Sequence, residues 1–165
     1  MLLGVGLDLC RIAPIRRSVS RLGKPWLDEI FTEAELAELV RSTDLAVAAA
    51  RGFAAKEASA KALSTGFGDG AHWLDFETGP AETVRPVRLH GGARDHACAL
   101  LPAKILIECQ TWLSRDCGWA VAVALMSDRS SSLDQTIIWS TVSEAVIKPL
   151  SSCSLRLNDI GRCYA

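Results

Sequence analysis

The chain lacks the residue groupings that hold soft metal ions. None of its 6 cysteines forms a Cys-x-x-Cys pair, and neither they nor its 3 histidines have the spacing of a zinc site. Any metal ion bound here is therefore expected to have oxygen ligands. Unpaired cysteines of this kind are typical of reduced thiols in a cytoplasmic protein.

Long apolar runs and an excess of one charge are also missing. No uninterrupted apolar stretch is long enough to cross a membrane, and the N-terminus lacks the basic start and apolar stretch of a secretory signal. The net charge of −1 argues against general binding to nucleic acid. The 165 residues, 49% hydrophobic and 22% charged, predict one globular domain with a sizeable core.

The first ten residues predict a strand that carries one carboxylate. Large apolar residues alternate with Gly4, Gly6 and Asp8 over residues 2–10, so these three residues share one face. The glycines leave space beside Asp8, and a bulky group can approach its carboxylate.

Residues 14–22 predict an amphipathic helix that begins at Pro14, because the fixed φ of proline suits the first turn. Its apolar stripe consists of Ile15, Val19 and Leu22. Basic residues with the same spacing on the other side are Arg17, Arg21 and Lys24. This basic stripe is either a solvated surface or a docking site for an acidic helix of a partner, since opposite charges speed association.

Two more helices are predicted by their N-terminal capping residues. Thr32 and Glu35 fit a capping box at the start of a short helix that runs to about Arg41. Asp44 can cap a long, alanine-rich helix that runs to about Leu63.

Four more strands and one helix complete the pattern. The expected strands are 73–78, 84–89, 104–111 and 119–126, and the expected helix is 93–101, after a break at Gly91-Gly92. In the last strand large hydrophobic residues alternate with alanine, as expected for a buried strand on which a helix packs closely. Residues 1–126 are therefore predicted to form an α+β fold, with an antiparallel sheet packed on one long helix.

The composition changes after Met126. Residues 127–165 are serine-rich and weakly patterned, so we expect a C-terminal extension rather than more of the domain. One helical stripe precedes Pro149 in this segment, at Ile138, Val142 and Ala145.

On the long helix Phe53, Glu57 and Lys61 share one face, because they are four residues apart. Taken alone, the Glu–Lys pair is a common solvated surface pair, and Asp8 is a strand-end carboxylate that faces water. Close packing of the alanine-rich helix on the glycine-rich strand would, however, bring Glu57 to Asp8. Two carboxylates with a lysine one turn away suit a hard metal ion and a phosphate-rich substrate. Amides of the glycine-rich loop 64–70 could approach a phosphate, although no nucleotide-binding loop is matched.

These segments, in this order, resemble the holo-acyl-carrier-protein synthases, a class of 4'-phosphopantetheinyl transferases. The most specific segment is Phe53–Leu63, which matches the family block Phe-Ala-Ala-Lys-Glu-Ala-x-x-Lys-Ala-Leu and continues into Thr65-Gly66. The other matches are Gly4–Leu9, the Phe-(Ser/Thr)-x-x-Glu-Leu segment at 31–36, Leu89-x-Gly91 and Ala120-x-Ala122-x-Ala124. The resemblance spans residues 2–126. It implies a 4'-phosphopantetheinyl transferase-like fold and, for members of this size, a homotrimer with sites between subunits.

The resemblance also implies a reaction. The family moves 4'-phosphopantetheine from coenzyme A to a serine of an apo acyl carrier protein, with Mg²⁺ on the pyrophosphate and 3',5'-ADP as the product. By position, Asp8 and Glu57 would bind Mg²⁺, and Lys61 would neutralise phosphate charge. Glu57 and Lys61 are the expected catalytic residues, and the general base is either Glu57 or a metal-positioned water. Expected contacts to the nucleotide are Lys61, Ser64, Thr65, Gly66 and Arg115. Expected contacts to the acidic carrier protein are Arg11, Arg17 and Arg21.

Three positions depart from the family pattern. Arg51 stands one place before the usual arginine, so its side chain is turned by about 100° around the helix. Trp112–Arg115 replaces a usual Ser-x-Ser-His, and Arg115 could bind phosphate as the histidine does. Ser64 replaces a usual glycine. Two alternatives stay open: a paralogue that hydrolyses coenzyme A without an acceptor, and a non-catalytic protein that only binds carrier proteins. The sequence does not distinguish a fatty-acid from a polyketide carrier.

Overall fold

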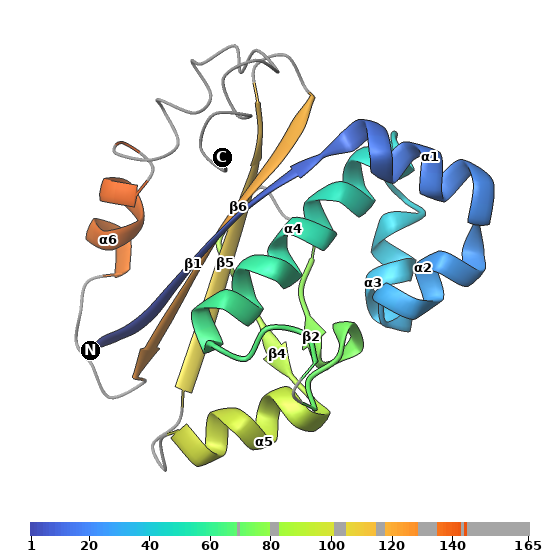
Figure 1. Ribbon diagram of the computed structural model, residues 1–165. Coiled ribbons are helices and arrows are strands. Elements are labelled where there is room, and N and C mark those ends of the chain that lie inside the picture. The colour runs from blue at the N-terminus through green and yellow to red at the C-terminus, as the bar shows by residue number, and fades with distance from the viewer. Residues whose placement is uncertain are drawn as a thin grey trace, which may run out of the picture.

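The computed structural model describes residues 1–68, 70–79, 83–100, 105–114, 118–128, 135–142 and 144 (Figure 1). Within them, four antiparallel strands form a sheet in the order β1-β6-β5-β3. The strands are β1 (Leu2–Arg11), β6 (Trp119–Asp128), β5 (Ile105–Leu113) and β3 (Arg85–Pro86). The three long strands end within two residues of their predicted ranges. Their antiparallel pairing, with one long helix against them, confirms the predicted α+β fold.

The long helix α4 (Leu45–Leu63) lies along one face of the sheet and contacts β1, β6 and β5. The other helices are α1 (Ile12–Leu22), α2 (Lys24–Ile30), α3 (Glu33–Leu39), α5 (Gly91–Leu100) and α6 (Gln135–Val142). Helices α1, α2 and α3 lie at one end of the protein, and α6 lies on the side of the sheet opposite α4 (Figure 1). None of the described helices is long and apolar enough to span a membrane.

The main chains of β1 and α4 touch. A Cβ atom on Gly6 would lie 1.8 Å from the carbonyl oxygen of Ala58, and one on Gly4 would lie 2.2 Å from that of Ala62. Both distances exclude a side chain, so this close approach requires glycine at both positions. The contact fixes Asp8, two residues further along β1, beside the helix.

Helix α4 begins where the capping pattern predicts. Asp44 Oδ1 accepts hydrogen bonds from the amides of Ala46 and Val47, at 3.0 and 3.2 Å, which confirms Asp44 as the N-cap. A hydrogen-bonded pair with Arg16 at 2.6 Å lowers the pKa of Asp44. At the other end of the helix, Ser64 has a left-handed φ of 60° and stops it.

The predicted capping box starts α3. The amide of Glu35 donates to Thr32 Oγ1 at 3.3 Å, and the amide of Thr32 donates to Glu35 Oε2 at 2.8 Å. The helix ends at Leu39, two residues before the expected end at Arg41.

Glu35 also belongs to a buried ion pair that the sequence analysis missed. It is 3% exposed and lies 2.8 Å from the Nζ atom of the fully buried Lys56. Lys56 Nζ also donates to the carbonyl oxygens of Trp73, at 3.0 Å, and Phe76, while the amide of Thr78 donates to Glu35 Oε1 at 2.7 Å. Burial lowers the pKa of Lys56, and the charge of Glu35 opposes this effect. The pair joins α3 and α4 to the chain around Phe76.

The first helix ends at Leu22, as predicted, but differs from its prediction at its start. It begins at Ile12, two residues before Pro14. It ends before Gly23, whose positive φ of 61° interrupts the helix. Lys24 therefore begins α2, where it pairs with Asp28 at 2.6 Å. The predicted basic stripe is thus wrong in its last residue, and only its two arginines lie on α1.

The two strands predicted between residues 73 and 89 are much shorter in the structure. The elements there are the 3-10 helix η1 (Trp73–Asp75), β2 (Phe76–Glu77), β3 and β4 (Arg88–Leu89). β2 and β4 form a separate sheet, whereas β3 pairs with β5. The chain changes sheets at Val87, next to Pro86, which has no amide donor and suits an edge strand. Gly91 and Gly92, expected to precede the next helix, are its first two residues.

The C-terminal segment contains the expected helical turn. β6 continues to Asp128, two residues beyond the predicted boundary at Met126. Helix α6 follows and includes Ile138 and Val142 of the predicted stripe, while Ala145 and Pro149 lie outside the described residues. The division into residues 1–126 and 127–165 stays a prediction.

Candidate active site

Asp8 and Lys61 meet where β1 crosses α4. Lys61 Nζ donates to Asp8 Oδ1 at 2.7 Å and to the carbonyl oxygen of Leu7 at 3.1 Å. The Asp8 side chain is 15% exposed and that of Lys61 is 48% exposed, so the pair lies at the edge of the protein. The sequence analysis expected Lys61 beside Glu57 or near a phosphate. In the structure its direct partner is Asp8.

Glu57 lies one turn before Lys61 on the same helix, partly buried. Burial raises its pKa most, the charge of Asp8 raises it further, and the charge of Lys61 opposes both. The neighbouring Cys10 responds to the same charges: burial, then Asp8 and Glu57, raise the pKa of its thiol to about 12. The crossing of β1 and α4 therefore holds two carboxylates in an electronegative and partly desolvated place.

These two carboxylates fit a hard divalent cation. They supply oxygen ligands from two rigid elements, and the cation that now sits on Asp8 is an ammonium group. Among the described residues, no group of three or more His, Cys, Asp and Glu side chains could hold a metal ion. Asp8 and Glu57 would thus provide part of a coordination shell, and substrate oxygens and water would complete it.

The loop after α4 differs from a phosphate-binding loop at its first two residues. The amide of Ser64 donates to the carbonyl oxygen of Lys61 at 3.1 Å, and that of Thr65 donates to Ala60 at 3.2 Å. These amides cap the helix. Gly66, Gly68 and Gly70 have positive φ angles, and a Cβ on any of them would meet nothing within 4 Å, so a ligand could approach the loop at these later positions.

An aromatic cluster, which the sequence analysis did not predict, holds this loop against the protein. Phe67 stacks on Trp73 with ring centroids 3.8 Å apart, and Phe53 of α4 lies 4.6 Å from the same indole. Phe53 lies one turn before Glu57 on α4, so the cluster connects this helix to the loop. Its members are far apart in the sequence, and no local spacing connects them.

The basic residues of α1 line a surface groove. Arg17 and Arg21 form it together with Pro14, Ser18 and Leu22, and its volume is about 320 Å³. Arg11, just before the helix, is exposed and lies over the ring of Trp119 at 5.5 Å. Arg17 and Arg21, two of the predicted docking residues, therefore line the same groove. Arg11, the third, lies outside the groove, over Trp119 of β6. Arg115 lies outside the described residues.

Comparisons with known proteins assign this chain to a family. The model of the 4'-phosphopantetheinyl transferase superfamily matches residues 4–124. The holo-[acyl-carrier-protein] synthase of Methylorubrum populi is 43% identical over 103 residues, which cover 62% of this chain and 76% of that protein. The chain belongs to the holo-[acyl-carrier-protein] synthases. The resemblance predicted from the sequence is confirmed.

Solved structures of holo-[acyl-carrier-protein] synthases share the fold. The enzyme from Neisseria meningitidis aligns with a TM-score of 0.61 at 20% identity, covering 78% of this chain and 100% of that one. The enzyme from Helicobacter pylori, solved in complex with coenzyme A, aligns with a TM-score of 0.53 at 22% identity, covering 74% of this chain and 99% of that one.

Arg51, the shifted arginine of this holo-[acyl-carrier-protein] synthase, is part of the core. Its side chain is 7% exposed, and its Nε and Nη2 atoms donate to Oγ1 and the carbonyl oxygen of Thr111, at 3.0 and 3.1 Å. Gly52 occupies the next position, where a Cβ would lie 2.8 Å from the ring of Phe31. The displaced arginine therefore ties α4 to β5.

Proposed function

We propose that the chain transfers 4'-phosphopantetheine from coenzyme A to a serine of an apo acyl carrier protein. The observation that carries the proposal is the meeting of Asp8 with Glu57 and Lys61, three residues of the family motifs, on two elements whose main chains touch. In the reaction the serine oxygen forms a bond to the phosphorus that carries pantetheine. The bond from that phosphorus to the bridging oxygen breaks, and 3',5'-ADP leaves with that oxygen.

The residues provide positioning and charge, which phosphoryl transfer needs more than covalent chemistry. Asp8 and Glu57 would hold Mg²⁺, which supplies neutralisation of the pyrophosphate charge when bound. Lys61, half exposed beside Asp8, is placed to turn its ammonium group toward a phosphate oxygen. The serine proton goes to a base, for which Glu57 and a metal-positioned water are the two candidates.

Mass spectrometry tests this function directly. An apo carrier protein mixed with coenzyme A, Mg²⁺ and this chain should gain the mass of one phosphopantetheine group, and 3',5'-ADP should appear in equal amount. Release of 3',5'-ADP without a change in the carrier would instead identify a coenzyme A hydrolase. Binding of the carrier with neither product would identify a non-catalytic carrier-binding protein. Carriers from fatty-acid and polyketide synthesis, compared in the same assay, identify the acceptor.

Lys61→Ala should slow transfer by roughly 10²- to 10³-fold, because a fixed cation near a transferring phosphate stabilises charge that develops in the transition state. Steady-state rates against coenzyme A and carrier protein measure the effect. Lys24→Ala is the matched control, since Lys24 also pairs with a carboxylate at 2.6 Å but lies on α2. If Lys61→Ala leaves both turnover and coenzyme A affinity unchanged, Lys61 is only a surface partner of Asp8.

We also propose that the groove of Arg17 and Arg21 receives the acidic carrier protein. Reversing both residues to Glu should raise the KM for carrier protein at least about tenfold, because like charges then repel across the interface. The KM for coenzyme A should change little. The loss should shrink toward 1 M salt, where the Debye length is about 3 Å.

The control for this charge reversal is Arg41→Glu with Arg94→Glu, two exposed arginines outside the groove. It makes the same change in net charge. Equal damage to the KM of coenzyme A and of carrier protein, or an equal effect of the control, would exclude the docking role.

The active form is proposed to be a homotrimer with sites between subunits, as the family resemblance implies. An exposed apolar stripe on β1 supports association. Val5, Leu7 and Leu9 are 56%, 42% and 37% exposed, side by side on the face of the strand that turns away from α4.

A further inference from the structure

The sheet has two very different faces. The inner face packs on α4 and consists largely of glycine and alanine in β1 and β6. The outer face carries the large residues, because antiparallel partners lie on the same side of a sheet. Its cross-strand pairs are Val5 with Leu125, Leu7 with Val123 and Leu9 with Val121. An apolar surface thus extends over β1 and β6 without interruption.

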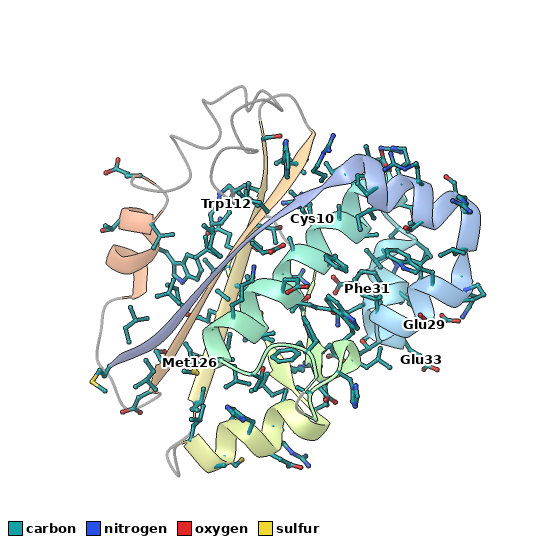
Figure 2. The ribbon with its side chains drawn as sticks, in the orientation of Figure 1. Cys10, Glu29, Phe31, Glu33, Trp112 and Met126 are labelled. Atoms are coloured by element: carbon teal, nitrogen blue, oxygen red, sulfur yellow. The ribbon has the colours of Figure 1, made fainter. Side chains whose placement is uncertain are left out.

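Helix α6 covers half of this outer face. Trp139, only 8% exposed, packs on Val123 and Leu125 of β6, and Trp112 of β5 lies against the same cluster. Figure 2 shows Trp112 on the side of the sheet that α6 occupies. The β1 half of the face, with the stripe from Val5 to Leu9, is left exposed.

Helix α6, which covers the β6 half of the outer face, lies outside the part of the chain that matches the family model. The family match ends at residue 124, before α6 begins at Gln135. The Neisseria meningitidis enzyme is covered along its whole length by 78% of this chain. Trp139 is also an imperfect fit to the face, because its Nε1 atom is buried and has no hydrogen-bond partner among the described residues. A buried donor without a partner weakens the packing of α6 on the sheet, which favours its displacement.

The exposed half alone is too small for a stable interface. Three neighbouring side chains on β1 are far fewer than the roughly 20–30 residues that each partner contributes to a standard interface. The outer face of β1 and β6 together is the larger apolar surface, and its β6 part is reached only when α6 moves away; β5 adds Trp112 to this face but also the polar Glu108 and Gln110. On the outer face of β1 the stripe consists of Val5, Leu7 and Leu9, while the charged Asp8 lies on the inner face. The stripe therefore suits another apolar surface better than an acidic carrier protein.

We propose that α6 and a second copy of this chain compete for the outer face of the sheet, so that the C-terminal segment sets the oligomeric state. With α6 seated on β6, copies of the chain associate weakly. With α6 displaced, the apolar surface over β1 and β6 is free for another copy. The proposal rests on the association proposed above and not on transfer activity, so a failure of the activity assay leaves it intact.

Sedimentation velocity of the full-length chain over a range of concentrations tests the competition. Trp139→Glu puts a charge against Val123 and Leu125 and should expel α6, so its association midpoint should fall at least about tenfold below that of the unchanged chain. Ser140→Glu is the matched control, because it adds the same charge at an exposed position of the same helix. It should keep the midpoint of the unchanged chain.

A second substitution separates specific association from misfolding. Val5→Glu in the Trp139→Glu chain should restore the monomer, because it places a charge in the proposed interface. Circular dichroism should show native secondary structure in each variant. The competition is overturned if the unchanged chain associates as tightly as Trp139→Glu, or if Trp139→Glu stays monomeric with native secondary structure. It is also overturned if Val5→Glu leaves the oligomer in place.

Discussion

Asp8→Ala and Glu57→Ala should each reduce transfer by more than about 10³-fold, because removal of one ligand would forfeit several kcal/mol of charge stabilisation at the phosphate. The two residues lie on different elements and approach one place, so neither can substitute for the other. Initial rates measured over a range of Mg²⁺ concentrations should show the loss at every concentration. The fold should persist, since both side chains lie at the edge of the core.

Two comparisons make this test specific. Asp8→Asn and Glu57→Gln keep the shape of the side chain and remove its charge, and each should lose nearly as much activity as the alanine variant. Glu29→Ala removes an exposed carboxylate on α2, which Figure 2 shows at the far side of the helical end, and it should leave the rate unchanged. Activity near that of the unchanged chain in Asp8→Ala or Glu57→Ala, at limiting Mg²⁺, would refute the metal site.

Lys56→Met should destabilise the protein by about 3–5 kcal/mol, the usual effect of removing one partner of a buried ion pair. Glu35 would keep its hydrogen bonds from the amides of Thr32 and Thr78 but lose its only cation within 4 Å among the described residues. The carbonyl oxygens of Trp73 and Phe76 would lose a donor as well. Urea unfolding, with the slope compared between variants, measures the loss.

Lys61→Met is the control for stability, because it removes an exposed lysine from the same helix. A pair of this exposure contributes less than about 1 kcal/mol. The family block contains both lysines, and the structure separates them: one is in the core and the other is at the site. If Lys56→Met costs no more than Lys61→Met, the buried pair does not hold α3 and α4 together.

Local patterns were sufficient to predict the elements that carry the site. The alternation in β1, the capping box of Thr32 and Glu35, and the N-cap Asp44 each depend on residues at most four positions apart. The small residues of β1 and α4 also predicted their close approach, and with it the meeting of Asp8 and the Glu57 face. The positions of all these residues follow from the local geometry of the backbone and do not depend on side chains that are distant in the sequence.

Local sequence patterns did not predict contacts between segments that are far apart in the sequence. Glu35 and Lys56 are 21 positions apart, and nothing in the spacing of a capping box indicates that its carboxylate also neutralises a buried lysine. The partner of Arg51 is 60 positions away on β5. Trp139 could be assigned to a helix but not to a face of the sheet. The start of α1 at Ile12 was missed because proline at position 14 suits a first helical turn, and the regular basic spacing extended the stripe across Gly23 to Lys24.

The contact between β1 and α4 also limits how this site can change in evolution. In most cores the gap between a strand and a helix is filled by side chains, so that a series of conservative substitutions can widen or narrow it. Here the gap is filled by the backbones themselves at Gly4 and Gly6, and any larger residue would have to push the whole helix outward. Substitutions elsewhere in the core are therefore expected to leave the distance between the Asp8 and Glu57 carboxylates unchanged. A descendant that needed a wider site would have to change the crossing of two elements at once, and this is why the same spacing can outlast extensive change in the rest of the sequence.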